Sequence, residues 1–151
     1  MSKNEKIIEV TDSMDKPALY VFESGIYKLS EKYFKCNDGD IIIEGQYANT
    51  IFKSDESITV DIGTVFKNLK FIYTKIIIKD NCRFENVTFD NCIVNMKSSQ
   101  EVDIVSCSFI NTGINFFNSC YNNIITNCRF KDCRLPRYYG GSNLFTNNLA
   151  Y

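Results

Sequence analysis

The sequence predicts an all-β protein, a single-stranded parallel β-helix (solenoid) of about five short coils. The first observation behind this prediction is a repeat: four phenylalanines lie 18, 20 and 21 residues apart, each at the same place in a seven-residue phrase. They are Phe71, Phe89, Phe109 and Phe130. The second observation is that apolar and polar residues alternate within each phrase, which is typical of a strand with one buried face. A fixed period of roughly 20 residues indicates coils that stack on one another.

Aligning the repeats on the phenylalanines brings further apolar or small residues into columns. Two residues before each phenylalanine lie Leu69, Val87, Cys107 and Cys128; five before lie Phe66, Phe84, Ile104 and Ile125. Three after lie Thr74, Cys92, Thr112 and Cys133; five after lie Ile76, Val94, Ile114 and Leu135; seven after lie Ile78, Met96, Phe116 and Arg137. Only Arg137 breaks its column. We therefore expect three short strands per coil, joined by turns rich in Asn, Asp, Ser and Gly.

The phrase Asn127-Cys-Arg-Phe-Lys-Asp-Cys has variants that begin at Asn68, Asn86 and Ser106. On these phrases the chain resembles the repeats of the pectin-lyase-like superfamily, whose fold is a right-handed parallel β-helix. The resemblance covers residues 64–151 well and residues 18–63 loosely. It implies a fold more than an activity, because this scaffold hosts lyases, hydrolases, phage spikes and pure binding modules.

We expect residues 1–17 to form an N-terminal tail or cap, residues 18–63 a cap with irregular first coils, and residues 64–151 the regular coils. The stretch that begins at Ser24 resembles the Gly-x-Tyr strand that precedes the first coils in this superfamily. Both ends of a β-helix expose strand edges and core, so the N-terminal stretch is expected to cover one end. At the other end a fifth phrase begins at Asn147. A second copy of the chain, docking there edge to edge, is one expected partner.

Asparagines and cysteines recur at fixed places in the repeat. Asn68, Asn86, Asn127 and Asn147 share a column with Ser106, and we expect a ladder of turn side chains that bond to backbone and to one another. Of the seven cysteines, Cys107 and Cys128 share one inward column, and Cys92 and Cys133 share another, where they alternate with Thr74 and Thr112; reduced cysteine behaves as a small buried hydrophobe. We therefore predict core fillers rather than disulfides, metal ligands or a nucleophile. Zinc sites use CxxC pairs or histidines, and the sequence contains neither, so we expect no metal and no cofactor.

The absence of histidine removes the commonest catalytic acid, base and metal ligand. The resemblance implies that an active relative would carry the aspartate and Arg-Ile-Lys phrases of polygalacturonases or the calcium-binding aspartates of pectate lyases. Those phrases do not occur, and the outward columns beside the phenylalanines contain one carboxylate. The outward residues are Lys70, Thr88, Ser108 and Arg129 on one side and Ile72, Asp90, Ile110 and Lys131 on the other. We predict that the protein is not an enzyme, with a carbohydrate-binding, lyase-like or hydrolase-like β-helix as the alternative.

Charge is divided unevenly along the chain, although the total is −1. Residues 1–61 contain seven lysines and twelve acids, a net charge of −5, and residues 62–151 contain ten basic and six acidic residues, a net charge of +4. The positive end is concentrated in Arg129, Lys131, Arg134, Arg137, Tyr138 and Tyr139. Because arginine and tyrosine dominate interface hot spots, we predict that these six residues bind a partner. A total charge near zero argues against nucleic acid.

No apolar run approaches the roughly 18 residues that a membrane span requires, and the first residues do not resemble a secretory signal. The sequence therefore predicts a cytoplasmic protein that binds another protein without catalysis, in an adaptor or cytosolic immunity-type role.

Overall fold

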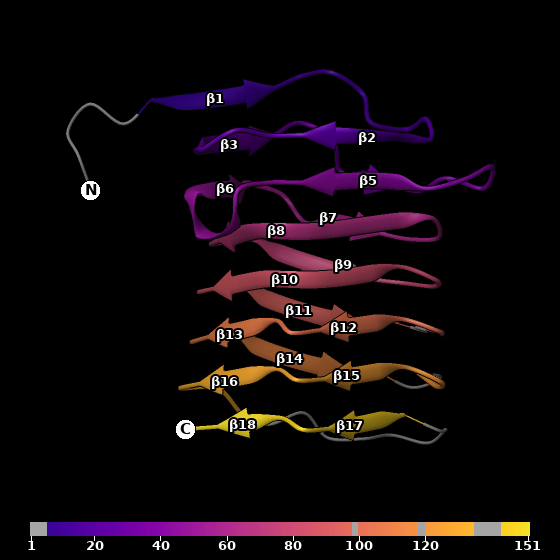
Figure 1. Ribbon diagram of the computed structural model, residues 1–151, viewed down its shortest axis with the longest axis vertical. Coiled ribbons are helices and arrows are strands. Elements are labelled where there is room, and N and C mark those ends of the chain that lie inside the picture. The colour runs from indigo at the N-terminus through magenta and orange to yellow at the C-terminus, as the bar shows by residue number, and fades with distance from the viewer. Residues whose placement is uncertain (1–5, 98–99, 118–119, 135–142) are drawn as a thin grey trace.

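The computed structural model describes residues 6–97, 100–117, 120–134 and 143–151. Its strands stack along one axis as a parallel β-solenoid of about seven turns (Figure 1). All the strand pairs are parallel, and the 3-10 helix η1 (Tyr47–Asn49) interrupts one turn. No helix in the part of the chain that the structure describes is long and apolar enough to cross a membrane. The all-β parallel solenoid predicted from the repeat is confirmed, and its right-handed sense stays a prediction.

The strands form three faces, and a coil contributes at most one strand or half-strand to each. The first face consists of β2 (Ala18–Val21), β5 (Ile41–Glu44), the first halves of β8 (Thr64–Ile72) and β10 (Arg83–Asp90), β12 (Asp103–Val105), β15 (Ile124–Thr126) and β17 (Leu144–Thr146). The second face consists of β1 (Ile7–Val10), β3 (Gly25–Leu29), β6 (Thr50–Lys53), the second halves of β8 and β10, β13 (Ser108–Ile110), β16 (Arg129–Lys131) and β18 (Leu149–Ala150). The third face consists of β4 (Tyr33–Phe34), β7 (Ile58–Val60), β9 (Lys75–Ile78), β11 (Ile93–Met96) and β14 (Gly113–Phe116).

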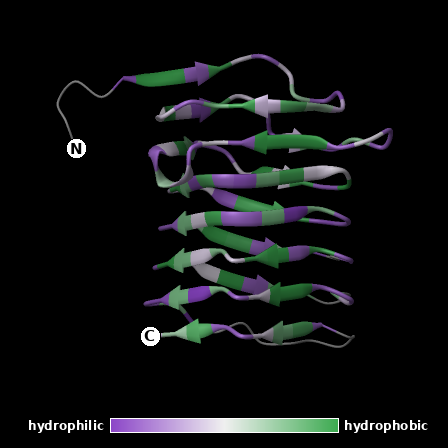
Figure 2. Cartoon of the chain, in the orientation of Figure 1, coloured by the Kyte–Doolittle hydropathy of each residue, from purple (hydrophilic) through white to green (hydrophobic). Residues whose placement is uncertain are grey.

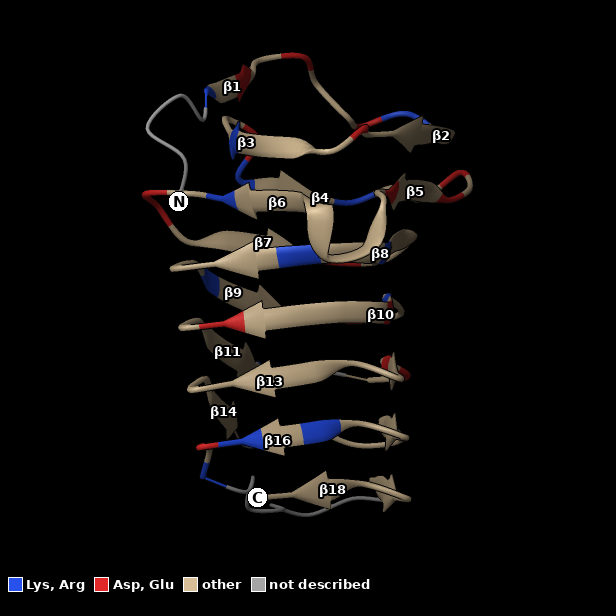
Figure 3. Cartoon of the chain, turned by 60° about the vertical axis from the view of Figure 1, so that its left-hand side comes forward, with Lys and Arg blue, Asp and Glu red and all other residues tan. Residues whose placement is uncertain are grey.

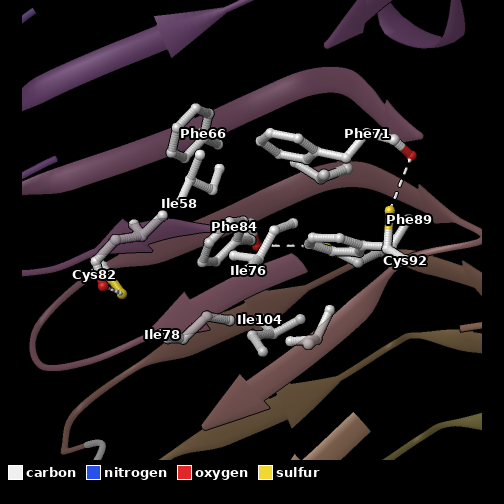
Figure 4. Close-up of a cluster of buried hydrophobic side chains, with 14 of the residues drawn as sticks. Ile58, Phe66, Phe71, Ile76, Ile78, Cys82, Phe84, Phe89, Cys92 and Ile104 are labelled. Carbon is white, nitrogen blue, oxygen red and sulfur yellow. Dashed lines mark hydrogen bonds between the residues drawn. The ribbon is translucent and has the colours of Figure 1, made fainter. Parts of the chain in front are cut away.

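The phenylalanine ladder lies inside the solenoid, as predicted. Phe71 pairs with Phe89, Phe89 with Phe109 and Phe109 with Phe130 in the strand register, and all four side chains are buried. The rings of Phe89 and Phe109 stack with centroids 4.9 Å apart, and those of Phe109 and Phe130 with centroids 4.8 Å apart. Figure 4 shows Phe71 and Phe89 beside the second row of rings, Phe66 and Phe84. Figure 2 shows the alternation of apolar and polar residues along β8 and β10 that places these rings inside.

The other predicted inward columns are also buried wherever the structure describes them, except that Cys133 is half-buried. Leu135 and Arg137, the last members of two columns, lie outside the described residues. The core therefore continues through the coils as a set of vertical columns, each contributed by one position of the repeat.

The expected number of coils was too low, because residues 18–63 also form coils in register with the rest. Tyr27 pairs with Phe52, and Phe52 with Phe71, so the aromatic ladder extends two coils further towards the N-terminus. These steps measure 25 and 19 residues. The long turn at residues 45–49 lengthens the first of these steps and conceals the period there. Before these coils, β1 pairs with β3, and Met14 is 2% exposed within the core cluster.

Two tight turns per coil depend on residues with positive φ. Asn68, Asn86, Ser106, Asn127 and Asn147 have φ between 51° and 58°, the left-handed region that asparagine tolerates better than most residues. The predicted amide ladder is confirmed between the first two, because the Asn86 Nδ2 donates to the Asn68 Oδ1 at 3.3 Å.

The next turn contains a second amide–amide hydrogen bond, in another column of the repeat. There Asn111 Nδ2 donates to Asn91 Oδ1 at 2.6 Å, and both residues again have positive φ. Tyr73 occupies the same left-handed position one coil earlier, with φ 47°.

The cysteines are free, and six of the seven are buried. We expected them to act as apolar fillers, but most of their thiols also form hydrogen bonds. The Cys92 Sγ donates to the carbonyl of Phe71 at 3.4 Å, as Figure 4 shows, and the Thr112 Oγ1 donates to the carbonyl of Phe89 at 2.9 Å one coil later. Both side chains donate to carbonyls near the ends of strands, which explains why cysteine and threonine alternate in one column. Burial raises the pKa of the Cys92 thiol to about 11 and that of Cys107 well above its ordinary value.

Candidate protein-binding surface

Arg129 and Lys131 lie on the outer side of β16, and Phe130 between them points into the core. Both basic side chains are exposed, and Phe130 is 1% exposed. The alternation of a strand therefore places the two positive charges on one surface, two residues apart. Figure 3 shows them as the blue segments of β16, between β13 and β18.

The neighbouring strands supply apolar groups to the same surface. Arg129 pairs with Leu149 of β18, and Lys131 pairs with Ile110 of β13. The hydrogen bond from the Tyr151 N–H to the Phe130 carbonyl continues this register, so Tyr151 lies beside Lys131. Leu149 and Tyr151 are 56% and 62% exposed. We call Ile110, Arg129, Lys131, Leu149 and Tyr151 the β16 patch.

Charge pairing distinguishes the β16 patch from the coils before it. On the same face Lys70 forms an ion pair with Asp90 at 3.2 Å. Among the residues that the structure describes, neither Arg129 nor Lys131 forms an ion pair. Two exposed positive charges are thus available to a partner, beside apolar surface.

The structure places the described members of the predicted site on β16 and on the segment that follows it. Arg134 is exposed, but it follows the left-handed turn at Asp132, whose φ is 54°. The Thr112 N–H donates to the Cys133 Sγ at 3.5 Å, so the chain has already left β16 when it reaches Arg134. Arg137, Tyr138 and Tyr139 lie outside the described residues, and their placement in the site stays a prediction.

Leu149 and Tyr151 are members of the β16 patch that the sequence reasoning missed. The signal that could have found them was the spacing of the repeat. Aligning Asn147 with Asn127 places Leu149 beside Arg129 and Tyr151 beside Lys131.

A charged cluster on the first face was not anticipated from the sequence. Arg83 donates to Glu85 at 3.3 Å and to Asp103 at 3.1 Å, so one guanidinium engages both carboxylates. The outward columns beside the phenylalanines contain Asp90, which Lys70 neutralises. Within the described ranges, no group of three or more Cys, Asp or Glu side chains is arranged to hold a metal ion.

A shallow hollow of about 440 Å³ lies on the turns between the second and third faces. It spans three coils, and an exposed aromatic ring, Tyr73, projects at its edge with 72% of its surface accessible. Asp55 in the longer turn above forms an ion pair with Lys28 at 2.7 Å, which holds the pKa of that carboxyl below its ordinary value. The hollow thus combines an aromatic face with carboxylate and amide groups. The other lining residues are Ser54, Glu56, Ser57, Thr74, Lys75, Asn91 and Ile93.

Comparison with known proteins gives a distant structural likeness. No protein-family model and no curated protein matches the chain. Among solved structures, one match is a crystal structure described as "a putative glycosyl hydrolase from Parabacteroides merdae". It is 13% identical, with 89% of this chain and 81% of that chain covered, at a TM-score of 0.32. A likeness this distant supports no statement about activity.

Proposed function

We propose that the protein is a non-catalytic binding module that recognises an acidic surface on a partner protein through the β16 patch. The observation that carries this proposal is the pair of exposed charges of Arg129 and Lys131, which form no ion pair with a described residue, next to exposed Leu149 and Tyr151. Arginine and tyrosine are enriched among residues that dominate binding energy. Complementary charge accelerates encounter and selects the partner.

The scaffold beneath the β16 patch also supports a binding role. β16 pairs with β13 on one side and β18 on the other, and the ring of Phe130 stacks on that of Phe109. A backbone fixed in this way loses little conformational freedom when a partner docks, so more of the contact energy remains as affinity. An adaptor or immunity-type role in the cytoplasm is the finer form of the proposal.

The test is a charge reversal with a matched control. The double variant Arg129→Glu, Lys131→Glu should weaken binding of proteins captured by the parent chain by at least about 2 kcal/mol, or roughly thirtyfold in Kd. The control, Lys75→Glu with Lys97→Glu, makes the same change in net charge away from β16 and should bind at parental affinity. Equal losses in both variants would show a general charge effect, and no loss in either would leave the β16 patch without a role.

A second copy of the chain is the other protein that this surface could bind. Sedimentation of the parent at several concentrations distinguishes the two cases, because a self-associating chain gains mass as concentration rises. A dimer that the β16 double variant abolishes would identify the partner as the chain itself.

Carbohydrate binding is a second candidate, favoured by the hollow beside Tyr73. An exposed aromatic ring with carboxylate and amide neighbours offers a stacking face and hydrogen-bonding groups in one concave site. A glycan array is the direct test. Binding that Tyr73→Ala removes and Tyr47→Ala retains would support this candidate, since both tyrosines are exposed and both have positive φ.

A further inference from the structure

In the part of the chain that the structure describes, one edge of the strand β2 has no neighbour. β2 pairs with β5 alone, and the N–H groups of Ala18 and Phe22 donate to the carbonyls of Asp40 and Glu44. In a parallel ladder alternate residues bond to the same neighbour, so the N–H and C=O groups of Leu19 and Val21 point to the opposite side. Within the described chain no backbone group bonds to them. β2 therefore presents two donors and two acceptors along an open edge.

The segment before β2 does not fill this position. β1 pairs with β3 on the second face, from Ile7 with Ile26 to Val10 with Leu29. Figure 1 shows β1 over β3, with β2 to the right of them. Met14, on the connection between β1 and β2, is buried in the core. Because β1 and Met14 occupy part of this end, a complete coil of a second molecule could not stack evenly on it. The position next to β2 therefore suits a single extended segment.

The edge of β2 lacks the features that usually prevent strand addition. Edge strands are commonly protected by charged residues, proline or a bulge. The sequence of β2 is Ala-Leu-Tyr-Val, without charge or proline, and Leu19 and Val21 are 56% and 64% exposed. β1, the other strand at this end, carries Glu9. An added strand could pack apolar side chains beside Leu19 and Val21 while its backbone completes the ladder.

The charge around β2 indicates what kind of segment would be recognised. Five exposed acids lie within six residues of β2 or β5 in the chain, accompanied by two exposed lysines, Lys16 and Lys35. The acids are Asp12, Asp15, Glu23, Asp38 and Asp40. Among described residues none of the five forms an ion pair. Two copies meeting edge to edge at β2 would bring these acids together, whereas a basic segment would neutralise them.

We propose that β2 is a docking edge for an extended basic segment of a partner protein, which adds as a further strand of the first face. This surface lies at the opposite end of the solenoid from the β16 patch and has the opposite charge. It goes beyond the proposed function, since a partner of β16 would be acidic and a partner of β2 basic.

The test uses a synthetic peptide, acetyl-Lys-Thr-Val-Thr-Val-Lys-amide, and amide resonances of the full chain. Binding should shift the Leu19 and Val21 amides and slow their hydrogen exchange by at least about tenfold. A peptide N-methylated at every residue lacks all of its backbone donors on both edges and should not produce this protection. A peptide with Glu in place of Lys should bind at least about tenfold more weakly at low salt.

A proline variant separates edge pairing from general folding. Val21→Pro removes an N–H on the open side of β2 and leaves the ladder to β5 intact, so it should fold and lose at least about tenfold in peptide affinity. The control Ile124→Lys alters an exposed residue in the same outward column as Leu19, five coils away, and should bind like the parent. Peptide shifts away from β2, or parental affinity in Val21→Pro, would overturn the proposal. Protection of Leu19 and Val21 that grows with protein concentration alone would overturn it in favour of a second copy.

Discussion

Phe109→Ala tests whether the aromatic ladder holds the coils together. The side chain of Phe109 is 0% exposed, and its ring stacks between those of Phe89 and Phe130 with interplanar angles of 11° and 6°. Truncation would remove two ring contacts and leave a cavity between two coils that their backbone ladders hold in place. Phe→Ala substitutions in cores cost about 3 to 5 kcal/mol, and we expect a value in that range.

The assay is urea unfolding followed by circular dichroism, with Phe117→Ala as the matched control. Phe117 is 42% exposed, with the Lys97 Nζ 5.6 Å from its ring centroid. Its truncation should cost less than about 1 kcal/mol, the usual size of an exposed cation–π contact. For a chain of this length, a loss of about 4 kcal/mol lowers the melting temperature by roughly 8 to 16 °C.

The reasoning would fail if Phe109→Ala unfolded at the same urea concentration as the parent. Similar losses for Phe109→Ala and Phe117→Ala would also contradict it, because burial would then not determine the cost.

Two further predictions concern the column of threonines and cysteines. Thr112→Val should cost about 1 to 3 kcal/mol of unfolding free energy in urea, because it removes the acceptor of the buried Cys92 N–H, whereas Thr112→Cys should cost less. For Cys92, burial raises the pKa of the folded thiol to about 11, against about 8.5 in the unfolded chain. The contribution of the Cys92 thiol to folding stability is fully present below about pH 8.5 and is lost as the pH rises towards 11. The unfolding free energy falls there by about 1.4 kcal/mol per pH unit. Cys92→Thr should therefore lose less stability than the parent between pH 8 and 10.

The central coils could be predicted from sequence because their turns are short and uniform. In β8 the turn between the first and second faces consists of Asn68 alone, between Lys67 and Leu69. Because the matching turn in β10 has the same length, the residues that follow it stay in their columns. Once Phe71 and Phe89 are aligned, alternation decides which side chains point inward. The same alternation placed Arg129 and Lys131 together on the outer side of β16.

The remaining features depend on contacts between coils that composition does not encode. Nothing in the sequence indicates that Lys70 forms an ion pair with Asp90 in the next coil, whereas Arg129 forms none with a described residue. The sequence also predicts that an N-terminal segment covers one end, but it does not indicate which strand β1 joins. That choice leaves β2 open, and it depends on how Met14 fits the end of the core.

The long turn at residues 45–49 explains why one early coil escaped detection, and it offers a last prediction. Glu44 aligns with Lys67 and Thr50 with Leu69, so Gly45 occupies the position of Asn68 and residues 46–49 are an insertion. Deleting these four residues should leave a folded solenoid, with Gly45 adopting the left-handed conformation that Asn68 has in the next coil.

The cost of this deletion should stay within about 1 kcal/mol, because it shortens a surface loop and removes one part-buried hydrogen bond, from the Gln46 N–H to the Thr50 Oγ1. The deletion also removes an exposed bond, from the Ser24 Oγ to the Gln46 Oε1, and one within the deleted turn, from the Asn49 N–H to the Gln46 carbonyl. Deleting four residues from β8 instead would break its register with β5 and β10 on both sides and should abolish cooperative unfolding. If the turn deletion also unfolded the chain, residues 46–49 would be part of the coil, and the alignment of the first coils with the later ones would be wrong.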